Sequence, residues 1–303
     1  MATFYINGTT LTNSTAIFTD AALTTCAADG YYKDASGVAR KLTSCVLGPI
    51  EPCPDCATTC GTGVSASGSQ GMYLLDIDVG NTASDVGAIV INFAPASVPD
   101  GIRATFDGSV YNKMSSPTDG YHASTVSGNF TYVGGSASGC VISGVTYPSL
   151  TEYIYVGGSF VPSGNTQSTT VAAGDVSLTI GAPGVLVMVI PKTTQTPSSV
   201  SFELSGPCTS TAWGITVDCP VILTSFSSSS TSEATALLAC GRTESASYYN
   251  VPVDTGTAGV PGVHDWVFSD EYGATILSDG FYKIDGGDVM EVANGVVLSR
   301  VSC

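Results

Sequence analysis

The sequence predicts an all-β fold: a central β-sandwich of the jelly-roll type, flanked by small related β-meander modules at both termini. Three observations lead to this prediction. Short apolar stretches of strand length, such as residues 88–91 and 185–190, are separated by turns rich in Gly, Ser and Pro. Polar and apolar residues alternate in segments 177–180 and 199–204, which is typical of strands with one buried face. A similar motif also occurs near both ends of the chain.

The motif at the two ends is a Phe-x-Asp triplet followed, at the same distance in both copies, by an Asp-Gly pair. The first copy has Phe18-Thr19-Asp20 and Asp29-Gly30-Tyr31-Tyr32-Lys33, and the second has Phe268-Ser269-Asp270 and Asp279-Gly280-Phe281-Tyr282-Lys283. Each copy continues to a Val-Leu pair, Val46-Leu47 or Val297-Leu298, and to a late cysteine, Cys53 or Cys303. Because Asp-Gly is a common turn pair, two unrelated hairpins are the alternative. Two related modules around a different middle favour an assembly protein over a compact enzyme.

The composition argues against several classes of partner. The chain has 303 residues, enough for two or three domains, and carries a net charge of −16. Its nine scattered basic residues cannot form the positive patch that nucleic-acid binding requires, and an anionic membrane surface would repel the chain. No apolar run is long enough to cross a bilayer. Charged residues make up only 11% of the chain, so its surface is either covered by partners or built from hydroxyl groups.

Changes in composition divide the chain into five segments. They are an N-terminal β-meander module at residues 1–50, a Cys/Gly/Ser-rich linker at residues 51–71, a β-sandwich at residues 72–222, a Ser-rich linker with a short helix at residues 223–247, and a C-terminal β module at residues 248–303. Within the sandwich, Asp107-Gly108 and Gly157-Gly158 predict two-residue hairpin turns. The helix is expected at residues 233–240, with Ser232 as its N-cap and Gly241 at its end.

Few residues could carry catalysis. The two histidines, His122 and His264, lie beside predicted turns and are expected at the surface. Asp76 and Asp78 are two apart on a predicted strand and so share one face. Such a pair can serve a glycosidase or a calcium site, but a solvated strand face is the simpler interpretation. The stretch Gly61-Thr62-Gly63-Val64-Ser65-Ala66 matches a loose dinucleotide-binding pattern, but it lacks the preceding strand and following helix of such a site. We therefore predict no catalytic and no cofactor-binding residue.

Three cysteines, Cys53, Cys56 and Cys60, are clustered in the first linker. Together with Cys45 they could hold zinc, although structural zinc sites usually combine two Cys pairs at a longer separation. The Cys-x-x-Cys pair also fits a redox motif, but no βαβ pattern surrounds it. Disulfides within the loop, or from the loop to Cys26 or Cys303, are the favoured interpretation. No metal site is predicted.

The N-terminus lacks the basic start and the apolar core of a signal peptide, which predicts synthesis in a cytosol. Ten cysteines are unusual for a protein that stays there. A particle that assembles inside a cell and is released by lysis, such as a virion, resolves this conflict.

Several segments resemble virion proteins of tailed bacteriophages, especially phages of marine or Bacteroidota hosts. The segments that carry the resemblance are Phe18–Thr25 with Ala28–Tyr32, Gly280–Lys283 with Cys303, Ser97–Phe106, and Val187–Lys192. The resemblance implies a structural component of the virion, often tail- or fibre-associated, and it identifies no catalytic residue.

We therefore expect a non-enzymatic virion protein that acts by assembly and host-surface binding. Its expected partners are other virion proteins and further copies of itself, with a trimer suggested by analogy with fibres. A host-surface glycan is a further candidate partner, whereas nucleic acid and membrane insertion are not expected. Two alternatives remain. One is a carbohydrate-binding adhesin whose sandwich carries the activity, and the other is a glycan-degrading spike that would use Asp76 or Asp78.

Overall fold

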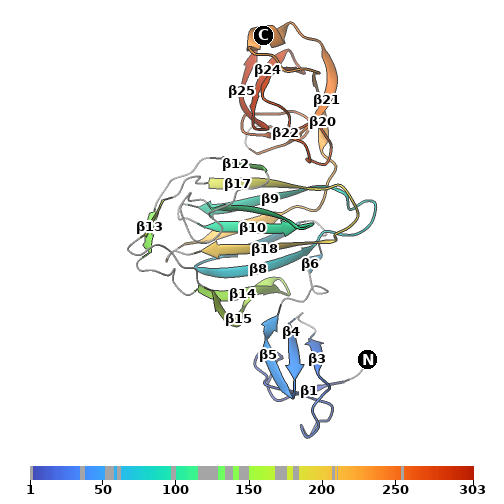
Figure 1. The fold of residues 1–303 in the computed structure, drawn as a ribbon, viewed down its shortest axis with the longest axis vertical. Helices are drawn as coiled ribbons and strands as arrows, with labels where there is room; N and C mark the ends of the chain where they lie inside the picture. Colours follow the sequence, from blue (N-terminus) through green and yellow to red (C-terminus); the bar gives the residue numbers. More distant parts are fainter. Residues whose placement is uncertain are drawn as a thin grey trace.

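The computed structural model describes residues 3–34, 38–51, 58–59, 63–96, 100–114, 129–133, 139–142, 150–167, 176–179, 184–206, 209, 211–253 and 256–303. In these residues the protein is all-β, as predicted, with one short helix. Three β units follow one another along the chain: an N-terminal module, a sandwich and a C-terminal barrel (Figure 1). The sandwich lies between the two smaller units, so the molecule is elongated (Figure 1).

The sandwich consists of two mainly antiparallel sheets. The first has the strand order β11-β10-β18-β8-β14-β15, with β6 also paired to β8, and the second has the order β12-β17-β9-β19-β7. The strands of the first sheet are β6 (Thr58–Thr59), β8 (Gly71–Asp78), β10 (Gly101–Phe106), β11 (Ser109–Met114), β14 (Leu150–Val156), β15 (Ser159–Gln167) and β18 (Ser199–Gly206). Those of the second are β7 (Val64–Gly68), β9 (Gly87–Ala96), β12 (Asn129–Val133), β17 (Gly184–Lys192) and β19 (Trp213–Val217). A separate pair joins β13 (Gly139–Ile142) to β16 (Val176–Thr179).

The core between the sheets follows from side-chain alternation. In β8, Tyr73, Leu75 and Ile77 are buried in this core, whereas Asp76 and Asp78 point to the opposite face. The predicted turns are confirmed as well. Asp107 and Gly108 connect β10 to β11 with φ values of 49° and 72°, the conformation that two-residue hairpins favour. Gly157-Gly158 likewise connects β14 to β15, with φ values of 60° and 91°.

The N-terminal module contains a three-stranded sheet, β3-β4-β5, and a two-stranded ladder, β1-β2. The strands are β1 (Tyr5–Ile6), β2 (Ile17–Phe18), β3 (Gly30–Lys33), β4 (Ala39–Thr43) and β5 (Val46–Glu51). The apolar side chains Leu42, Leu47 and Ile50 are buried in one cluster with Ile154 of β14, and Val161 of β15 packs against it. The module therefore covers the outer face of the first sheet of the sandwich.

The C-terminal unit is a closed barrel with the strand order β20-β21-β22-β25-β24-β23. The strands are β20 (Thr224–Ser229), β21 (Glu244–Val251), β22 (Trp266–Phe268), β23 (Gly280–Ile284), β24 (Asp288–Ala293) and β25 (Val296–Ser302). Trp266, Phe268 and Val251 are buried together with Val187 and Val189 of β17. Through these contacts the barrel covers the outer face of the second sheet.

The predicted linkers need correction. Residues 64–68, assigned to the first linker, form strand β7 of the sandwich. The serine run assigned to the second linker contains β20, a full member of the barrel. A strand of serines is accommodated there because Ser228 and Ser229 are buried with their hydroxyls satisfied by the carbonyl oxygens of Lys283 and Thr231. The C-terminal unit is accordingly a barrel and not a meander.

The helix also begins later than predicted. Helix α1 (Ala236–Cys240) is capped by Thr235, whose hydroxyl accepts a hydrogen bond from the Leu238 amide, and ends at Gly241 as expected. Ser232 cannot cap it because the next residue is held in an extended pairing. The Glu233 amide donates to the Phe281 carbonyl, and the Phe281 amide donates back, both at 2.9 Å.

The predicted relationship between the two terminal modules is visible at the level of single hydrogen bonds, with a constant shift of 250 positions. The Asp20 carboxylate accepts from the amides of Thr24 and Thr25, and that of Asp270 accepts from Ala274 and Thr275. The carboxylate of the Asp-Gly pair caps the last turn in both: Asp29 accepts from the Ser44 amide at 2.8 Å, and Asp279 accepts from the Asn294 amide at 2.7 Å. The two modules thus share one backbone plan.

One part of the predicted alignment is wrong by a single residue. Leu47 donates its amide to the Thr15 carbonyl, and the equivalent bond joins Val297 to Asp265. The residues equivalent to Val46-Leu47 are therefore Val296-Val297, and not Val297-Leu298.

The predicted pairing of Cys26 or Cys303 with the cysteine cluster of the first linker is wrong. Cys26 pairs with Cys45, and Cys303 pairs with Cys240 of α1, so neither reaches the cysteine cluster of the first linker. Cys53, Cys56 and Cys60 lie outside the described residues. In the C-terminal copy the positions of Cys26 and Cys45 are taken by Ile276 and Gly295, and a Cβ atom added at Gly295 would lie 2.7 Å from that of Ile276. The same contact is thus a disulfide in the N-terminal copy and the packing of Ile276 against Gly295 in the C-terminal copy.

This exchange predicts that the C-terminal solution can be transplanted. The double variant Cys26→Ile/Cys45→Gly should remain folded, because Cys45 has a φ of 66°, which glycine adopts without strain. The matched control Cys26→Ala/Cys45→Ala should lose about 2–4 kcal/mol of unfolding free energy. Urea titrations followed by circular dichroism measure both. Equal stability of the two double variants would contradict the proposed equivalence.

A second prediction concerns Asp100, which is fully buried just before β10 and accepts a hydrogen bond from the Thr211 hydroxyl at 2.7 Å. Burial raises the pKa of Asp100 to about 8. At pH values between the ordinary carboxyl pKa and about 8, Asp100 is protonated in the folded protein and loses its proton on unfolding. The contribution of Asp100 to stability therefore falls as the pH rises through this range. The Asp100→Asn variant, neutral at every pH, should therefore gain stability over the wild type from pH 5 toward pH 8, by up to about 1.4 kcal/mol per pH unit. Parallel stability curves for the two proteins would disprove a neutral Asp100.

Candidate functional site

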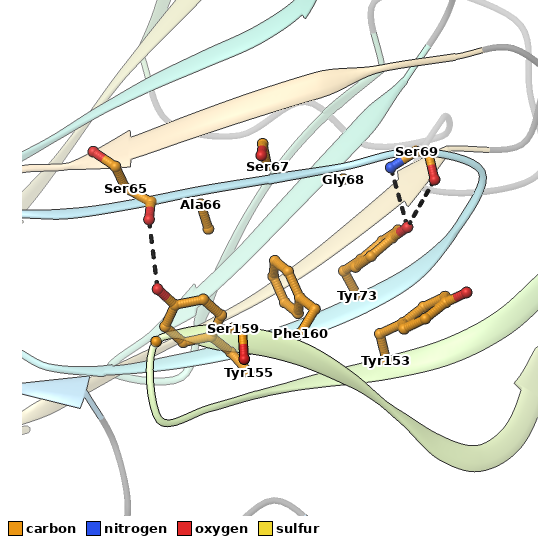
Figure 2. A pocket seen from close by; sticks show the side chains of 11 residues that line it. Ser65, Ala66, Ser67, Gly68, Ser69, Tyr73, Tyr153, Tyr155, Ser159 and Phe160 are labelled. Carbon is orange, nitrogen blue, oxygen red and sulfur yellow. Dashed lines mark hydrogen bonds between the residues drawn. The ribbon is translucent and has the colours of Figure 1, made fainter.

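A cleft of about 450 Å³ opens where the edges of the two sandwich sheets meet (Figure 2). One wall is β7, the edge strand of the second sheet, and the other is the β14–β15 hairpin at the edge of the first. Figure 2 shows the rings of Tyr73, Tyr153, Tyr155 and Phe160 in a row beneath the serine-rich strand β7. The lining residues carry no charge at neutral pH.

The aromatic rings form one connected stack. Tyr73 and Tyr153 are parallel, with centroids 4.7 Å apart and an interplanar angle of 9°. Phe160 meets both Tyr73 and Tyr155 edge to face at 4.9 Å. Buried Trp213 of β19 also packs edge to face against the stack, with its centroid 4.8 Å from that of Tyr73. Pairs with these geometries add to the free energy of burial, so the cleft has a rigid floor.

The polar groups of the cleft are hydroxyls and backbone atoms. The Tyr73 hydroxyl accepts a hydrogen bond from the Ser69 amide at 3.1 Å, and the Tyr155 hydroxyl donates to the Ser65 carbonyl at 3.5 Å. The side chains of Ser65, Ser67 and Ser69 are on exposed residues of the rim. A ring floor beneath neutral hydroxyls can bind a ligand that has apolar faces and many hydroxyl groups.

Glycines at the end of β7 and the start of β8 are required because the aromatic rings come close to the backbone there. A Cβ atom at Gly68 would lie 2.8 Å from the Tyr73 ring and closer still to the Trp213 ring. Gly71, with a φ of 153°, lies equally close to the rings of Tyr73 and Tyr153. These glycines read as linker residues in the sequence, but they allow the aromatic stack to form.

A second hollow of about 430 Å³ lies along β7, β9 and β19 and shares the residues Ser65, Ala66 and Ser67 with the cleft. Its lining includes Asn92, Gly214 and Thr216, and Thr216 approaches Ser65 at 3.4 Å between their hydroxyl oxygens. Strand β7 is therefore exposed to both hollows.

Asp76 and Asp78 lie on one face of β8, as predicted, opposite Ser201 and Ser199 of β18. The Asp78 carboxylate accepts a hydrogen bond from the Gly80 amide at 2.9 Å. Desolvation lowers the pKa of Lys192, and the negative charges of Asp85 and Asp78 partly offset this shift. The Lys192 ammonium group donates to two carbonyl oxygens. Asp78 thus has a structural role, and neither carboxylate is among the residues that line the cleft.

The remaining sequence candidates lie elsewhere. His264 is exposed and has a φ of 73°, in agreement with the prediction of a surface turn. His122 lies outside the described residues. The described part of the glycine pattern, residues 63–66, runs into strand β7 and not into the helix that a dinucleotide-binding loop requires. Within the described part of the chain, no group of three or more His, Cys, Asp or Glu residues could hold a metal ion.

The sequence alone did not identify the cleft. The aromatic pairs that stand out there, such as Tyr31-Tyr32 and Tyr248-Tyr249, lie in the terminal modules. The cleft instead uses Tyr153 and Tyr155, which are two apart and flank a hairpin with Phe160. The spacing of Tyr153 and Tyr155 indicates that both lie on one face of their strand, but nothing in the sequence shows that β7 lies opposite that face.

No helix among the described residues is long and apolar enough to cross a membrane. Comparison with protein-family models, curated proteins and solved structures finds no match for this chain.

Proposed function

We propose that this chain is a structural protein of a tailed-bacteriophage virion, tail- or fibre-associated, that acts by assembly and catalyses no reaction. One observation carries the proposal: two copies of the same module cover the outer faces of the two opposite sheets of one sandwich. Such a molecule carries related modules at its two ends, which suits docking to other polypeptides.

The two copies attach to the sandwich in different ways, and this leaves different surfaces exposed. In the C-terminal copy, a Cβ atom at Gly273 would lie 2.8 Å from Val189 of β17, so this turn packs on the sandwich. The equivalent Leu23 in the N-terminal copy is exposed. The same loop is thus a buried contact at one end and a free apolar surface at the other, where a partner can bind.

The composition and the resemblance to phage virion proteins supply the biological setting. The sandwich would be a variant of the jelly roll, and the protein would be made in the host cytoplasm and released by lysis. Homo-oligomers, with trimers suggested by fibre analogy, and contacts with other virion proteins would bury its weakly charged surface.

The test is the composition of the particle. In phage particles purified on density gradients and stripped of loose protein by salt, mass spectrometry should find this chain at a constant copy number per particle. Deletion of its gene should yield particles that are defective in assembly or in host attachment. A chain absent from the particles, with normal infectivity after deletion, would refute the proposal.

The cleft supports a second candidate function, binding of a neutral carbohydrate. Its aromatic floor can stack on the apolar face of a sugar ring, and its serine hydroxyls and backbone groups can bind the sugar hydroxyls. The lack of charge among the lining residues favours a neutral sugar over a sialic or uronic acid.

A glycan array probed with the full chain tests this candidate. Tyr153→Ala should weaken binding of a neutral glycan by about five- to thirtyfold, since stacking on one ring contributes on the order of 1–2 kcal/mol. Tyr31→Ala is the matched control, because it removes an exposed tyrosine far from the cleft, and it should bind as the wild type does. Binding that is equal in both variants would place the sugar elsewhere.

A further inference from the structure

The two terminal modules differ in one element of their architecture. In the C-terminal barrel, β20 lies between β21 and β23 and closes the barrel. Two serines of β20 bind the outer edge of β23: the Ser228 hydroxyl donates to the Lys283 carbonyl at 2.9 Å, and the Lys283 amide donates to the Ser229 hydroxyl at 3.2 Å. The described part of the N-terminal module has no strand in the position of β20, and β3 is an edge strand of its sheet.

The strands and aromatic rings that border the position of β20 are nevertheless alike in the two modules. β1 pairs with β2 through Tyr5 and Phe18, as β21 pairs with β22 through Tyr249 and Phe268. By this register Phe4 takes the place of Tyr248. The Phe4 and Tyr32 rings meet edge to face at 5.1 Å, and those of Tyr248 and Tyr282 do the same at 5.9 Å. An aromatic pair therefore borders the position in both modules.

Within the described residues, the position is filled in one module and open in the other. A Cβ atom at Gly280 would lie 2.6 Å from the Cβ of Ser232, whereas one at the equivalent Gly30 would meet nothing within 4 Å. Tyr282 is only 2% exposed, but its counterpart Tyr32 is half-buried, and Phe4 is 44% exposed. The tyrosine ring that is buried in the complete barrel is thus partly exposed to solvent in the N-terminal module.

We propose that the edge between β1 and β3 is an acceptor site for a β-strand supplied by another polypeptide. The occupant is defined by the chemistry of β20: an extended segment, antiparallel to β3, with two adjacent hydroxyl residues and an aromatic residue two positions before them. The hydroxyls bind the amide and carbonyl of Lys33, as those of Ser228 and Ser229 bind Lys283. The aromatic residue covers Phe4, as Phe226 covers Tyr248 at 6.4 Å between ring centroids. This is strand addition at an exposed sheet edge, and it does not depend on the virion proposal.

Charge adds a preference for an acidic donor. Lys33 and Lys41 lie on the same exposed face of the β3–β4 ladder. In the C-terminal barrel the donor segment continues from the serines to Glu233, which pairs with Phe281 of β23. A donor strand with a carboxylate at its end would be attracted to the lysines.

The probe is a fluorescent synthetic peptide with the sequence of residues 223–233, titrated against the full chain and followed by anisotropy. Saturable binding is expected, with a dissociation constant of about 1 mM or below. The chain variant Lys33→Pro removes the outward amide of the edge strand and should weaken binding at least about tenfold. Lys33→Ala keeps that amide and is the matched control, which should weaken binding less than Lys33→Pro does because it removes only the attraction of one lysine to the peptide's carboxylate.

Variants of the peptide keep the test decisive even if Lys33→Pro does not fold. Replacing both serines at the positions of Ser228 and Ser229 by alanine, or the phenylalanine by serine, should each weaken binding to the wild-type chain several-fold. The proposal is overturned if the peptide does not bind, or if binding is unchanged with the altered peptides or with a folded Lys33→Pro. It is likewise overturned if the edge pairs with the same edge of a second copy of the chain. The chain would then form a dimer that the peptide does not dissociate and that the Lys33→Pro variant no longer forms.

Discussion

The structure depends on one constraint: strands β9 and β17 are apolar on both faces. Ile89, Ile91 and Phe93 fill the core between the two sheets, while Ala88 and Val90 face the opposite side with Val187 and Val189 of β17. A sheet of this kind is stable only if both faces are removed from water. The C-terminal barrel covers the outer face with Trp266 and Phe268, and the indole of Trp266 donates a hydrogen bond to the Val187 carbonyl at 3.3 Å.

The same requirement, in weaker form, places the N-terminal module. The outer face of β14 and β15 presents Ile154 and Val161, which are covered by Leu42, Leu47 and Ile50. One backbone plan therefore performs the same task twice, on opposite sheets. The plan is fixed by short carboxylate-to-amide bonds in the turns, at Asp20 and Asp29 in one copy and their equivalents in the other. Beyond those turns the copies diverge: one is held by a disulfide and left open at β3, and the other is closed by β20.

The cleft arises for a different reason, because a two-sheet sandwich cannot hydrogen-bond its two sheets together along their edges. Where β7 ends one sheet and the β14–β15 hairpin ends the other, aromatic side chains fill the gap and leave their outer faces accessible. The rings that stabilise this seam are the same ones that give it binding capacity. A surface that is rigid for structural reasons loses little entropy when a ligand binds.

The sequence by itself determined the local features. The alternation of β8, the hairpin turns at Asp107-Gly108 and Gly157-Gly158, and the repeated motif at the two ends are encoded by neighbouring residues. All are present as predicted, except that the Val-Leu pair of the second copy was aligned one residue too late. Only the tertiary structure decided what depends on distant partners. The serines of β20 and the glycine of β7 look like linker residues until Lys283 and Trp213 are seen beside them, and the partner of Cys26 could not be chosen from spacing. Apart from the β10–β11 and β14–β15 hairpins, successive strands of the sandwich from β7 to β19 lie in different sheets. No local signal could therefore show that Tyr153 and Ser67 would face each other across one cleft.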